Sequence, residues 1–198
     1  MGKAERTKVF IAEKTAPLFN QKGYAGTSLN DMTDTTGLTK GAIYGNFEDK
    51  DDVALAAFDH NMNALISQVR ELQADERTAL GKLKAFITVY RSGLQSSPIL
   101  KDGCPIINTG TEADDTHPRL KEKANAALAR WQKSISAIIQ QGKIQEEFKE
   151  NVSSNDFASL MIAMIEGGFT LSKISGDNSY LEQSLNQLDN LIAANLKR

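Results

Sequence analysis

The sequence predicts an all-α protein, and three features of the 198-residue chain support that prediction. Apolar residues recur at intervals of three and four, the period of an amphipathic helix. No stretch sustains the two-residue alternation of a half-buried strand. Residues 27–50 read as two short helices joined by a glycine turn and followed by the start of a third. We therefore expect a three-helix domain at residues 1–50 and a helical domain at residues 51–198.

The segment at residues 27–50 carries local signals for each of its parts. Ser28 opens a capping box, which starts a helix. Gly37 stands where the chain must turn, since glycine tolerates positive φ. Thr39 can cap the next helix. Ile43 and Phe47 are four residues apart, so they should turn one face of that second helix inward.

The opposite face of the second helix is thin and almost uncharged. Lys40 is the only charged residue from position 35 to 47, and glycines keep the surface low. Lys50 follows at the next helix start, where free backbone N–H groups also attract phosphate. A helix-turn-helix unit lays its second helix in the major groove, so duplex DNA is the expected partner. The alternative is a helical hairpin whose glycines only permit packing. The candidate DNA-binding residues are Thr27, Ser28, Thr39, Lys40, Gly41, Ala42, Tyr44, Gly45, Asn46 and Lys50.

A longer motif surrounds this unit. It consists of Phe19, Gly23-Tyr24, Thr27-Ser28-Leu29, Gly37-Leu38-Thr39-Lys40-Gly41-Ala42-Ile43-Tyr44, Phe47 and Lys50. The motif closely resembles the N-terminal domain of TetR-type transcriptional regulators and covers the first quarter of the chain. Members of that family are all-helical homodimers that usually repress nearby genes and release DNA when a small molecule enters the C-terminal domain. The resemblance therefore implies operator DNA, a small-molecule effector and a second copy of the chain as partners.

Three positions depart from the family pattern. Met32-Thr33 stands where an Ile-Ala pair is frequent, and Asn46 where a histidine is frequent. Pro17 falls inside the expected first helix and should kink it, because proline removes one backbone hydrogen bond. These departures bear on DNA sequence preference rather than on the fold.

The composition agrees with a soluble regulator. The length allows a real core in one or two domains, and no apolar run reaches 18 residues. The polar start argues against a signal peptide. A single cysteine excludes an intramolecular disulfide and fits a reducing compartment. We expect a cytoplasmic bacterial protein without a membrane partner.

Basic charge is confined to a few positions. The first 50 residues carry seven Lys or Arg against six Asp or Glu, and the remainder carries 16 against 19. The basic footprint should therefore be local, formed by residues 3–8, Lys40 and Lys50. We expect modest non-specific affinity for DNA, with specificity resting on the recognition helix and on the pairing of two domains.

Helical patterns continue beyond residue 50. Asp49 can cap the first of these helices, while Ser153 and Ser179 supply capping signals for the last two. The long helix that opens near Pro118 bears a single apolar stripe. The expected spans are about 49–73, 77–96, a short helix after Pro105, 116–142, 153–171 and 179–192.

The last two helices are candidates for a dimer surface, because the segment at 156–171 is apolar on more than one face. Two copies could form a four-helix bundle across a two-fold axis. The alternative is an ordinary buried helix, and the family resemblance favours the dimer. The candidate interface residues are Phe157, Leu160, Gly167, Gly168, Leu181, Leu185, Leu188 and Ile192.

An effector pocket between helices would be lined by apolar and aromatic residues. The same residues could equally form plain core. Asn108 and Glu112 are among the possible polar anchors for the effector. The candidate lining residues are Met62, Ile66, Phe86, Tyr90, Ile107, Trp131, Ile135, Met161, Met164 and Phe169.

Cys104 precedes Pro105 at an expected helix start, where a thiol can become reactive. A redox sensor and an inert structural thiol both fit this position. An enzyme is the competing class of function, with a Cys104–His117 dyad as its one conceivable centre. No phosphate-binding glycine loop and no metal-ligand motif is present in the sequence, so we expect no cofactor, no metal and no catalysis. An adaptor that uses the helix-turn-helix for protein contacts is a third alternative.

Overall fold

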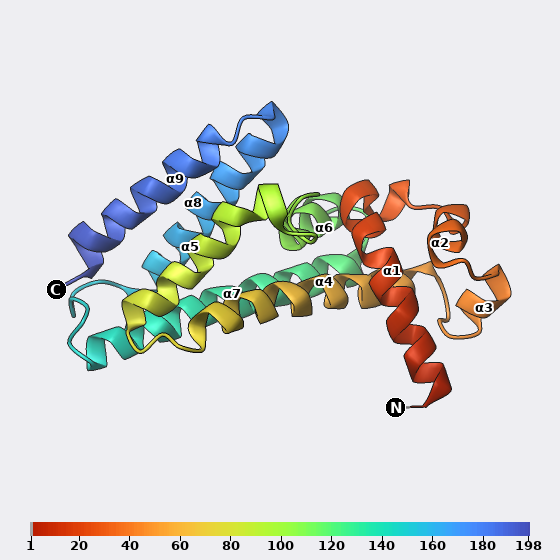
Figure 1. Ribbon diagram of the computed structural model, residues 1–198, viewed down its shortest axis with the longest axis horizontal. Coiled ribbons are helices and arrows are strands. Elements are labelled where there is room, and N and C mark those ends of the chain that lie inside the picture. The colour runs from red at the N-terminus through yellow and green to blue at the C-terminus, as the bar shows by residue number, and fades with distance from the viewer. Residues whose placement is uncertain (1) are drawn as a thin grey trace. The chain divides into compact units, whose positions relative to one another are not determined.

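The computed structural model describes residues 2–198, and for residues 94–96 only the backbone. Regular structure in that part of the chain is helical apart from one antiparallel bridge between Phe148 and Lys197 (Figure 1), which confirms the all-α prediction. The helices are α1 (Lys3–Gly26), α2 (Leu29–Thr36), α3 (Lys40–Tyr44), α4 (Lys50–Gln73), α5 (Ala79–Ser96), α6 (Pro105–Ala113), α7 (Pro118–Ile144), α8 (Ser154–Ser175), α9 (Ser179–Leu191) and the π-helical η1 (Ile192–Leu196).

The helices group into two compact units. The first comprises the chain up to Leu65 together with Asp102–Asn125, and the second comprises Ile66–Lys101 and Ala126–Arg198. α4 and α7 contribute residues to both units, whereas α6 belongs to the first unit with α1, α2 and α3. The residues that gather around the expected DNA-binding segment therefore include more than the first 50.

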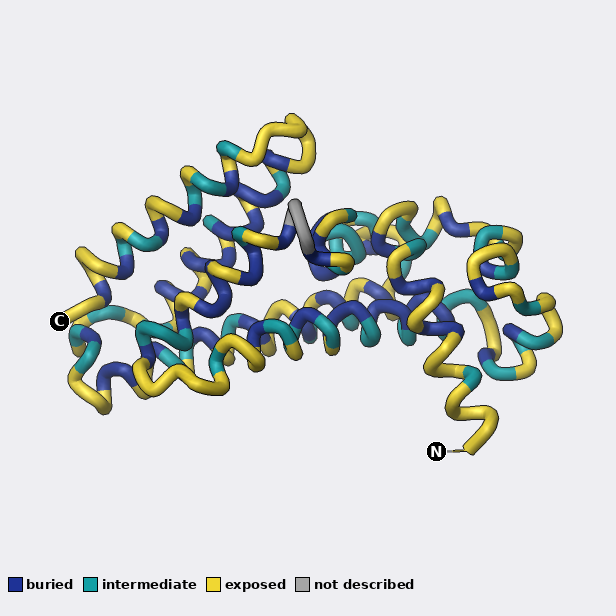
Figure 2. Tube along the Cα trace, viewed as in Figure 1, coloured by how far each residue is buried: buried dark blue, intermediate teal, exposed yellow. Residues whose placement is uncertain are grey.

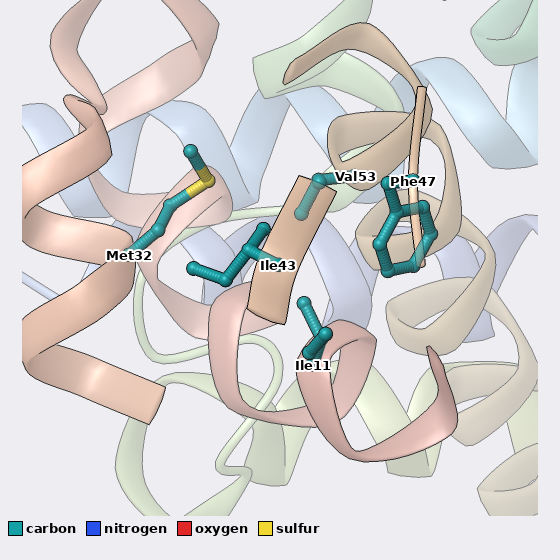
Figure 3. Close-up of a cluster of buried hydrophobic side chains, with 5 residues drawn as sticks. All are labelled: Ile11, Met32, Ile43, Phe47 and Val53. Carbon is teal, nitrogen blue, oxygen red and sulfur yellow. The ribbon is translucent and has the colours of Figure 1, made fainter. Parts of the chain in front are cut away.

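A small apolar core holds the first unit together. Ile11 of α1, Met32 of α2 and Ile43 of α3 are fully buried, and Phe47 and Val53 complete the cluster. Figure 3 shows these five side chains converging between the helices. The inward orientation predicted for Ile43 and Phe47 is confirmed. Burial stabilises each such side chain by about 1.5–3 kcal/mol, which is what orders α3, because a helix of 5 residues is not stable alone.

α1 is interrupted close to its C-terminal end. Gly23 adopts φ 74° and ψ 178°, a backbone conformation that residues with side chains rarely take. Pro17 lies inside the helix, whereas Gly23 is where the helical dihedral angles are lost, so the break in α1 falls six residues after the proline. The carbonyl that Pro17 deprives of its helical partner belongs to Glu13, an exposed residue that water can reach.

The core of the second unit is aromatic. Tyr90 of α5 stacks on Trp131 of α7 with 5.4 Å between ring centroids, and it meets Phe169 of α8 edge to face at 5.7 Å. All three rings are buried. Aromatic pairs contribute about 0.5–1.5 kcal/mol beyond their buried area, so this trio fixes three helices around one point.

α8 and α9 pack against each other within the chain as an antiparallel pair (Figure 1). Gly168 permits their close approach, because a Cβ there would lie 2.7 Å from the Ser184 Cβ. Leu181, Leu185 and Leu188 are buried. The leucine stripe predicted to contact a second copy thus covers α8 of the same chain, and that assignment is wrong.

Two further interface candidates, Phe157 and Ile192, are also buried within the chain. Of the eight candidates, only Leu160 and Gly167 are exposed. Apolar periodicity shows that a face will be covered but not which helix covers it, and here the neighbouring helix of the same chain does.

The predicted start of α8 is confirmed, since Ser153 caps it. The start predicted for α9 is wrong in detail. Asn178 is the residue before the helix, and the Asp177 carboxylate accepts the Ser179 N–H at 2.9 Å and its hydroxyl at 2.8 Å. A carboxylate is the stronger acceptor, so Asp177 takes the role expected of Ser179.

Among the described residues, α8 is the one helix long and apolar enough to cross a membrane. Half of its most apolar window is buried, and the helix packs on α5 and α9. Those are the features of a core helix in a folded domain.

Candidate DNA interface

The turn between α2 and α3 has the predicted geometry. Ser28 and Asp31 form a complete capping box, with 3.1 Å from the Asp31 N–H to Ser28 Oγ and 2.8 Å from the Ser28 N–H to Asp31 Oδ2. Gly37 ends α2 with φ 68°. Thr39 Oγ1 accepts the Ala42 N–H at 3.2 Å and caps α3. These local signals confirm the order of helix, left-handed turn and helix.

α3 presents a thin face to its surroundings. Among the described residues, no heavy atom outside the helix backbone lies within 4 Å of a Cβ built at Gly41, so this surface is open. The buried Ile43 holds the opposite side. A partner can therefore approach the α3 backbone closely. The exposed or half-exposed residues of this face are Thr39, Lys40, Gly41, Ala42, Tyr44, Gly45 and Asn46.

Three of the candidate DNA-binding residues, Thr27, Ser28 and Asn46, make hydrogen bonds within the chain. Thr27 is fully buried and its hydroxyl donates to the Gly23 carbonyl at 2.7 Å, so its assignment to DNA contact is wrong. The Ser28 hydroxyl is committed to the capping box. Asn46 Nδ2 donates to the Ala42 carbonyl at 2.9 Å and secures the end of α3. Such short polar side chains often bond to nearby backbone, which competes with contact to a partner.

Lys50 lies half-exposed at the start of α4, with Nζ 4.3 Å from the centroid of the Tyr24 ring. One backbone N–H of this first turn is capped, because Asp49 Oδ1 accepts the Asp52 N–H at 2.8 Å. Asp51 adds another carboxylate to the first turn. Phosphate binding at this helix end therefore stays a prediction, in which the Lys50 ammonium group would take part.

A surface ion pair ties α1 to α2. Lys22 Nζ lies 2.6 Å from the Asp31 carboxylate, which also takes part in the capping box. The hydrogen bond from Lys22, with those from Ser28, holds the pKa of Asp31 well below its usual range. Solvent screens an exposed pair of this kind, so its main consequence is orientation of α2.

A second polar cluster joins the end of α1 to the starts of α4 and α7. The Tyr24 hydroxyl donates to Asp51, and Asp51 Oδ2 lies 3.1 Å from His117 Nε2. The Tyr24 and His117 rings meet edge to face at 4.6 Å. His117 Nδ1 accepts the Leu120 N–H at 3.2 Å, so the proton of the neutral ring is assigned to Nε2, which donates to Asp51.

This cluster shifts two titrations. Partial burial, followed by the hydrogen bond to Asp51, raises the pKa of Tyr24 to about 12. The same hydrogen bond from Tyr24, with help from His117 and Arg119, lowers the pKa of Asp51. At neutral pH the phenol is therefore neutral and the carboxylate charged, which is the pair of states that the bond requires.

The alternative catalytic centre is not formed. Both ring nitrogens of His117 are engaged, by Asp51 and by the Leu120 backbone, so they do not form the dyad with Cys104. Cys104 precedes α6 and is 2% exposed.

The residues predicted to line an effector pocket are mostly core. Met62 and Ile107 belong to the first unit and the other eight to the second. A cavity of about 430 Å³ in the second unit has a different lining, which includes Arg70 and Lys82. The buried candidates are Met62, Phe86, Tyr90, Trp131, Ile135, Met161 and Phe169, and the half-buried ones are Ile66, Ile107 and Met164.

Two family models match the chain. The model described as "Bacterial regulatory proteins, tetR family" matches residues 11–57, which include α2 and α3. The model described as "Tetracyclin repressor-like, C-terminal domain" matches residues 79–188, more than half of the chain. The chain belongs to the TetR family.

Whole-chain relatives agree with this assignment. A TetR-family transcriptional regulator from Cytophaga hutchinsonii is 39% identical with a TM-score of 0.92, covering 100% of this chain and 98% of that one. One from Chloroflexus aurantiacus is 34% identical with a TM-score of 0.92, covering 100% and 99%. An uncharacterized HTH-type transcriptional regulator of Lactococcus lactis is 28% identical over 193 residues, 92% of this chain and 91% of that protein. This TetR-family protein is thus a DNA-binding transcriptional regulator, a class that is not enzymatic.

Proposed function

We propose that this regulator is a ligand-responsive repressor that binds a palindromic operator as a homodimer in the cytoplasm. Residues 1–50 supply the DNA-binding domain and residues 51–198 the effector-binding and dimerisation domain. The observation that carries the proposal is the open, nearly uncharged face of α3, which a buried core holds in place.

Contacts on this face divide into two kinds. Lys40 is exposed, whereas Tyr44 is half-buried and packs against the core, and they have the cation and the hydroxyl that bind phosphate. Thr39 and Gly41 lie on its thinnest part, where base edges can come close. Phosphate contacts position a protein on the duplex, and contacts to base edges select the sequence. Lys50 adds a phosphate contact beside α3.

The outer face of α8 supports dimerisation. Leu160, Ala163, Gly167, Leu171 and Ile174 follow one another at helical spacing and are all exposed. The side chains of Leu171 and Ile174 are 50% and 78% exposed, unusual for apolar residues in such a row. Figure 2 shows buried and exposed positions alternating along α8. This stripe replaces the interface expected from the sequence.

A second copy of the chain is the occupant that fits this stripe. An uncharged helical face is self-complementary across a two-fold axis, and the small residues Ala163 and Gly167 at its centre let two helices approach closely. Specific interfaces bury about 1,600 Å², which is more than one helix can supply. α9 offers further surface, because Tyr180 is also exposed. The TetR resemblance, which implies pairing through the final helices, agrees with this arrangement.

The aromatic core of the second unit supports an effector site. Trp131 Nε1 is buried and has no hydrogen-bond partner among the described residues. Leaving such a donor without a partner costs about 1–3 kcal/mol, which an acceptor on a bound molecule would offset. The rings of Tyr90 and Phe169 lie beside it. An amphipathic small molecule with an apolar body and one acceptor would offset this cost if the packed rings moved apart to admit it.

Gel shifts on duplex fragments in rising salt test the DNA-binding part of the proposal. We expect saturable binding. The logarithm of the association constant should fall linearly with the logarithm of the salt concentration, because binding releases counterions from the DNA. An adaptor or an enzyme gives no such shift. Absence of a shift at low salt and micromolar protein would overturn the proposal.

A further inference from the structure

Two side chains of α6 bond to the interrupted end of α1. In an unbroken helix the Asn20 carbonyl would accept the Tyr24 N–H. Here the Asn20 carbonyl accepts from Asn108 Nδ2 at 3.0 Å, and the Tyr24 N–H donates to Glu112 Oε2 at 2.7 Å. Asn108 and Glu112 are four residues apart, so they lie on one face of α6. α6 thus supplies a donor for the Asn20 carbonyl and an acceptor for the Tyr24 N–H, the two groups that would bond to each other in an unbroken helix.

The Glu112 carboxylate makes a two-pronged contact. Its second oxygen, Oε1, accepts the Ala25 N–H at 2.8 Å, so consecutive amides are held by one acid. A charged acceptor makes stronger hydrogen bonds than a neutral one. Gly23 is adapted to this contact twice over, because it has φ 74° and because a Cβ there would lie 2.4 Å from Glu112 Oε2.

The chain leaves this contact directly toward the helix-turn-helix. Thr27 closes the last turn on the Gly23 carbonyl, and the next residue, Ser28, caps α2. The direction in which α1 ends therefore determines where α2 and α3 begin. On the other side, α6 is anchored by Asn20 Nδ2, which donates to the Gly103 carbonyl at 2.9 Å.

We propose that Glu112 is a positioning residue for DNA binding, whose carboxylate sets the angle between α1 and the helix-turn-helix and couples that angle to α6. A displacement of α6 then moves the recognition helix without any change in the DNA-facing residues. Two half-sites about one helical turn apart, roughly 34 Å, require a fixed separation of recognition helices. The inference rests on the proposed function, since it assumes a two-fold operator.

The test compares Glu112→Gln with Glu122→Gln, which makes the same charge change at an exposed position of α7. Glutamine has an NH2 donor in place of one carboxylate oxygen and carries no charge, so it cannot accept the Tyr24 and Ala25 N–H groups on separate oxygens. Fluorescence anisotropy titrations measure the affinity for two duplexes. One is an operator obtained by selection from random sequences, and the other is the same operator with one base pair inserted between its half-sites. We expect Glu112→Gln to weaken binding to the operator at least about fivefold, which is the low end of allosteric coupling. We also expect it to reduce the ratio between the affinity for the correctly spaced operator and the affinity for the lengthened one.

A purely structural role would lower the melting temperature but leave the spacing preference of the folded protein intact. If Glu112→Gln matches Glu122→Gln in affinity and in spacing preference, the inference fails although the unmodified protein still binds DNA. If the unmodified protein does not bind DNA, the proposed function fails as well.

Hydrogen exchange on the unmodified protein gives an answer even if the variant does not fold. The Ala25 amide is at the exposed end of α1, so it exchanges quickly unless Glu112 holds it. We expect the Tyr24 and Ala25 amides to be protected together, and rapid exchange of both would overturn the inference. Gly23→Ala supplies a further check, because it displaces the same carboxylate and its effect should not add to that of Glu112→Gln.

Discussion

The Tyr24 hydroxyl donates a hydrogen bond to the Asp51 carboxylate, and this bond joins the end of α1 to the first turn of α4. His117 reaches the same carboxylate from the start of α7. The Asp51 side chain therefore joins the end of α1, the first turn of α4 and the start of α7 beside the candidate DNA interface.

Asp51→Asn should destabilise the protein in a pH-dependent way. The pKa of Asp51 is lowered from 3.8 in the folded state, so its stabilisation is present above that pH and is lost as pH falls further. We expect the variant to be less stable by about 1.5–3 kcal/mol at pH 7, the range for hydrogen bonds to a charged group. Thermal melts from pH 7 to pH 3 measure this, with the exposed Asp75→Asn as control. A deficit that persists unchanged at pH 3 would contradict the assignment.

The stabilisation that Tyr24 contributes should be lost as pH rises, whereas that of Asp51 is lost as pH falls. Its folded pKa of about 12 exceeds the unfolded value of 10.0, so its stabilisation is present below pH 10 and is lost as pH rises through 12. Absorbance titration of the phenolates should show one tyrosine ionising later than the others. Tyr24→Phe should remove that late step.

Lys40→Ala and Tyr44→Ala should each weaken binding to all DNA sequences to a similar degree, because phosphate contacts carry no sequence information. Lys40→Ala should also reduce the salt slope by about one. Lys101→Ala, an exposed lysine of the second unit, is the matched control. Affinities equal to that of the control would remove these residues from the interface.

Leu171→Glu and Ala163→Glu should produce monomers that keep their helical content, because both residues are exposed on the outer face of α8. Gln21→Glu, at an exposed position of α1 in the first unit, should leave the dimer intact. Leu188→Glu should instead unfold the α8–α9 pair, since Leu188 is buried within the chain. Sedimentation with circular dichroism separates these outcomes, and a monomeric unmodified protein at micromolar concentration would refute the interface.

Cys104 should react slowly with iodoacetamide in the native protein and rapidly after unfolding, because it is 2% exposed. Cys104→Ser should keep its operator affinity in the presence and absence of mild oxidant. If oxidant releases DNA from the unmodified protein but not from Cys104→Ser, the thiol is a sensor.

Local signals made the helix-turn-helix predictable. A capping box at Ser28, a glycine at position 37 and a cap at Thr39 each act within four residues, so the sequence displays them directly. The Glu112 contact could not be predicted this way, because it joins residues 88 positions apart. Glu112 and Asn108 were assigned to an effector from their polarity alone, whereas they bind the end of α1. Similarly, the apolar pattern of α8 and α9 did not reveal that each is the other's partner.

Selection of bound duplexes from a random-sequence library examines the recognition helix and the dimer in one experiment. We expect a two-fold symmetric consensus whose half-sites are centred about one helical turn apart, bound by two protomers. Bulky replacements at Thr39 or Gly41 should change the bases selected within each half-site. A consensus without two-fold symmetry, or no enrichment at all, would show that this protein does not bind a palindromic operator as a dimer.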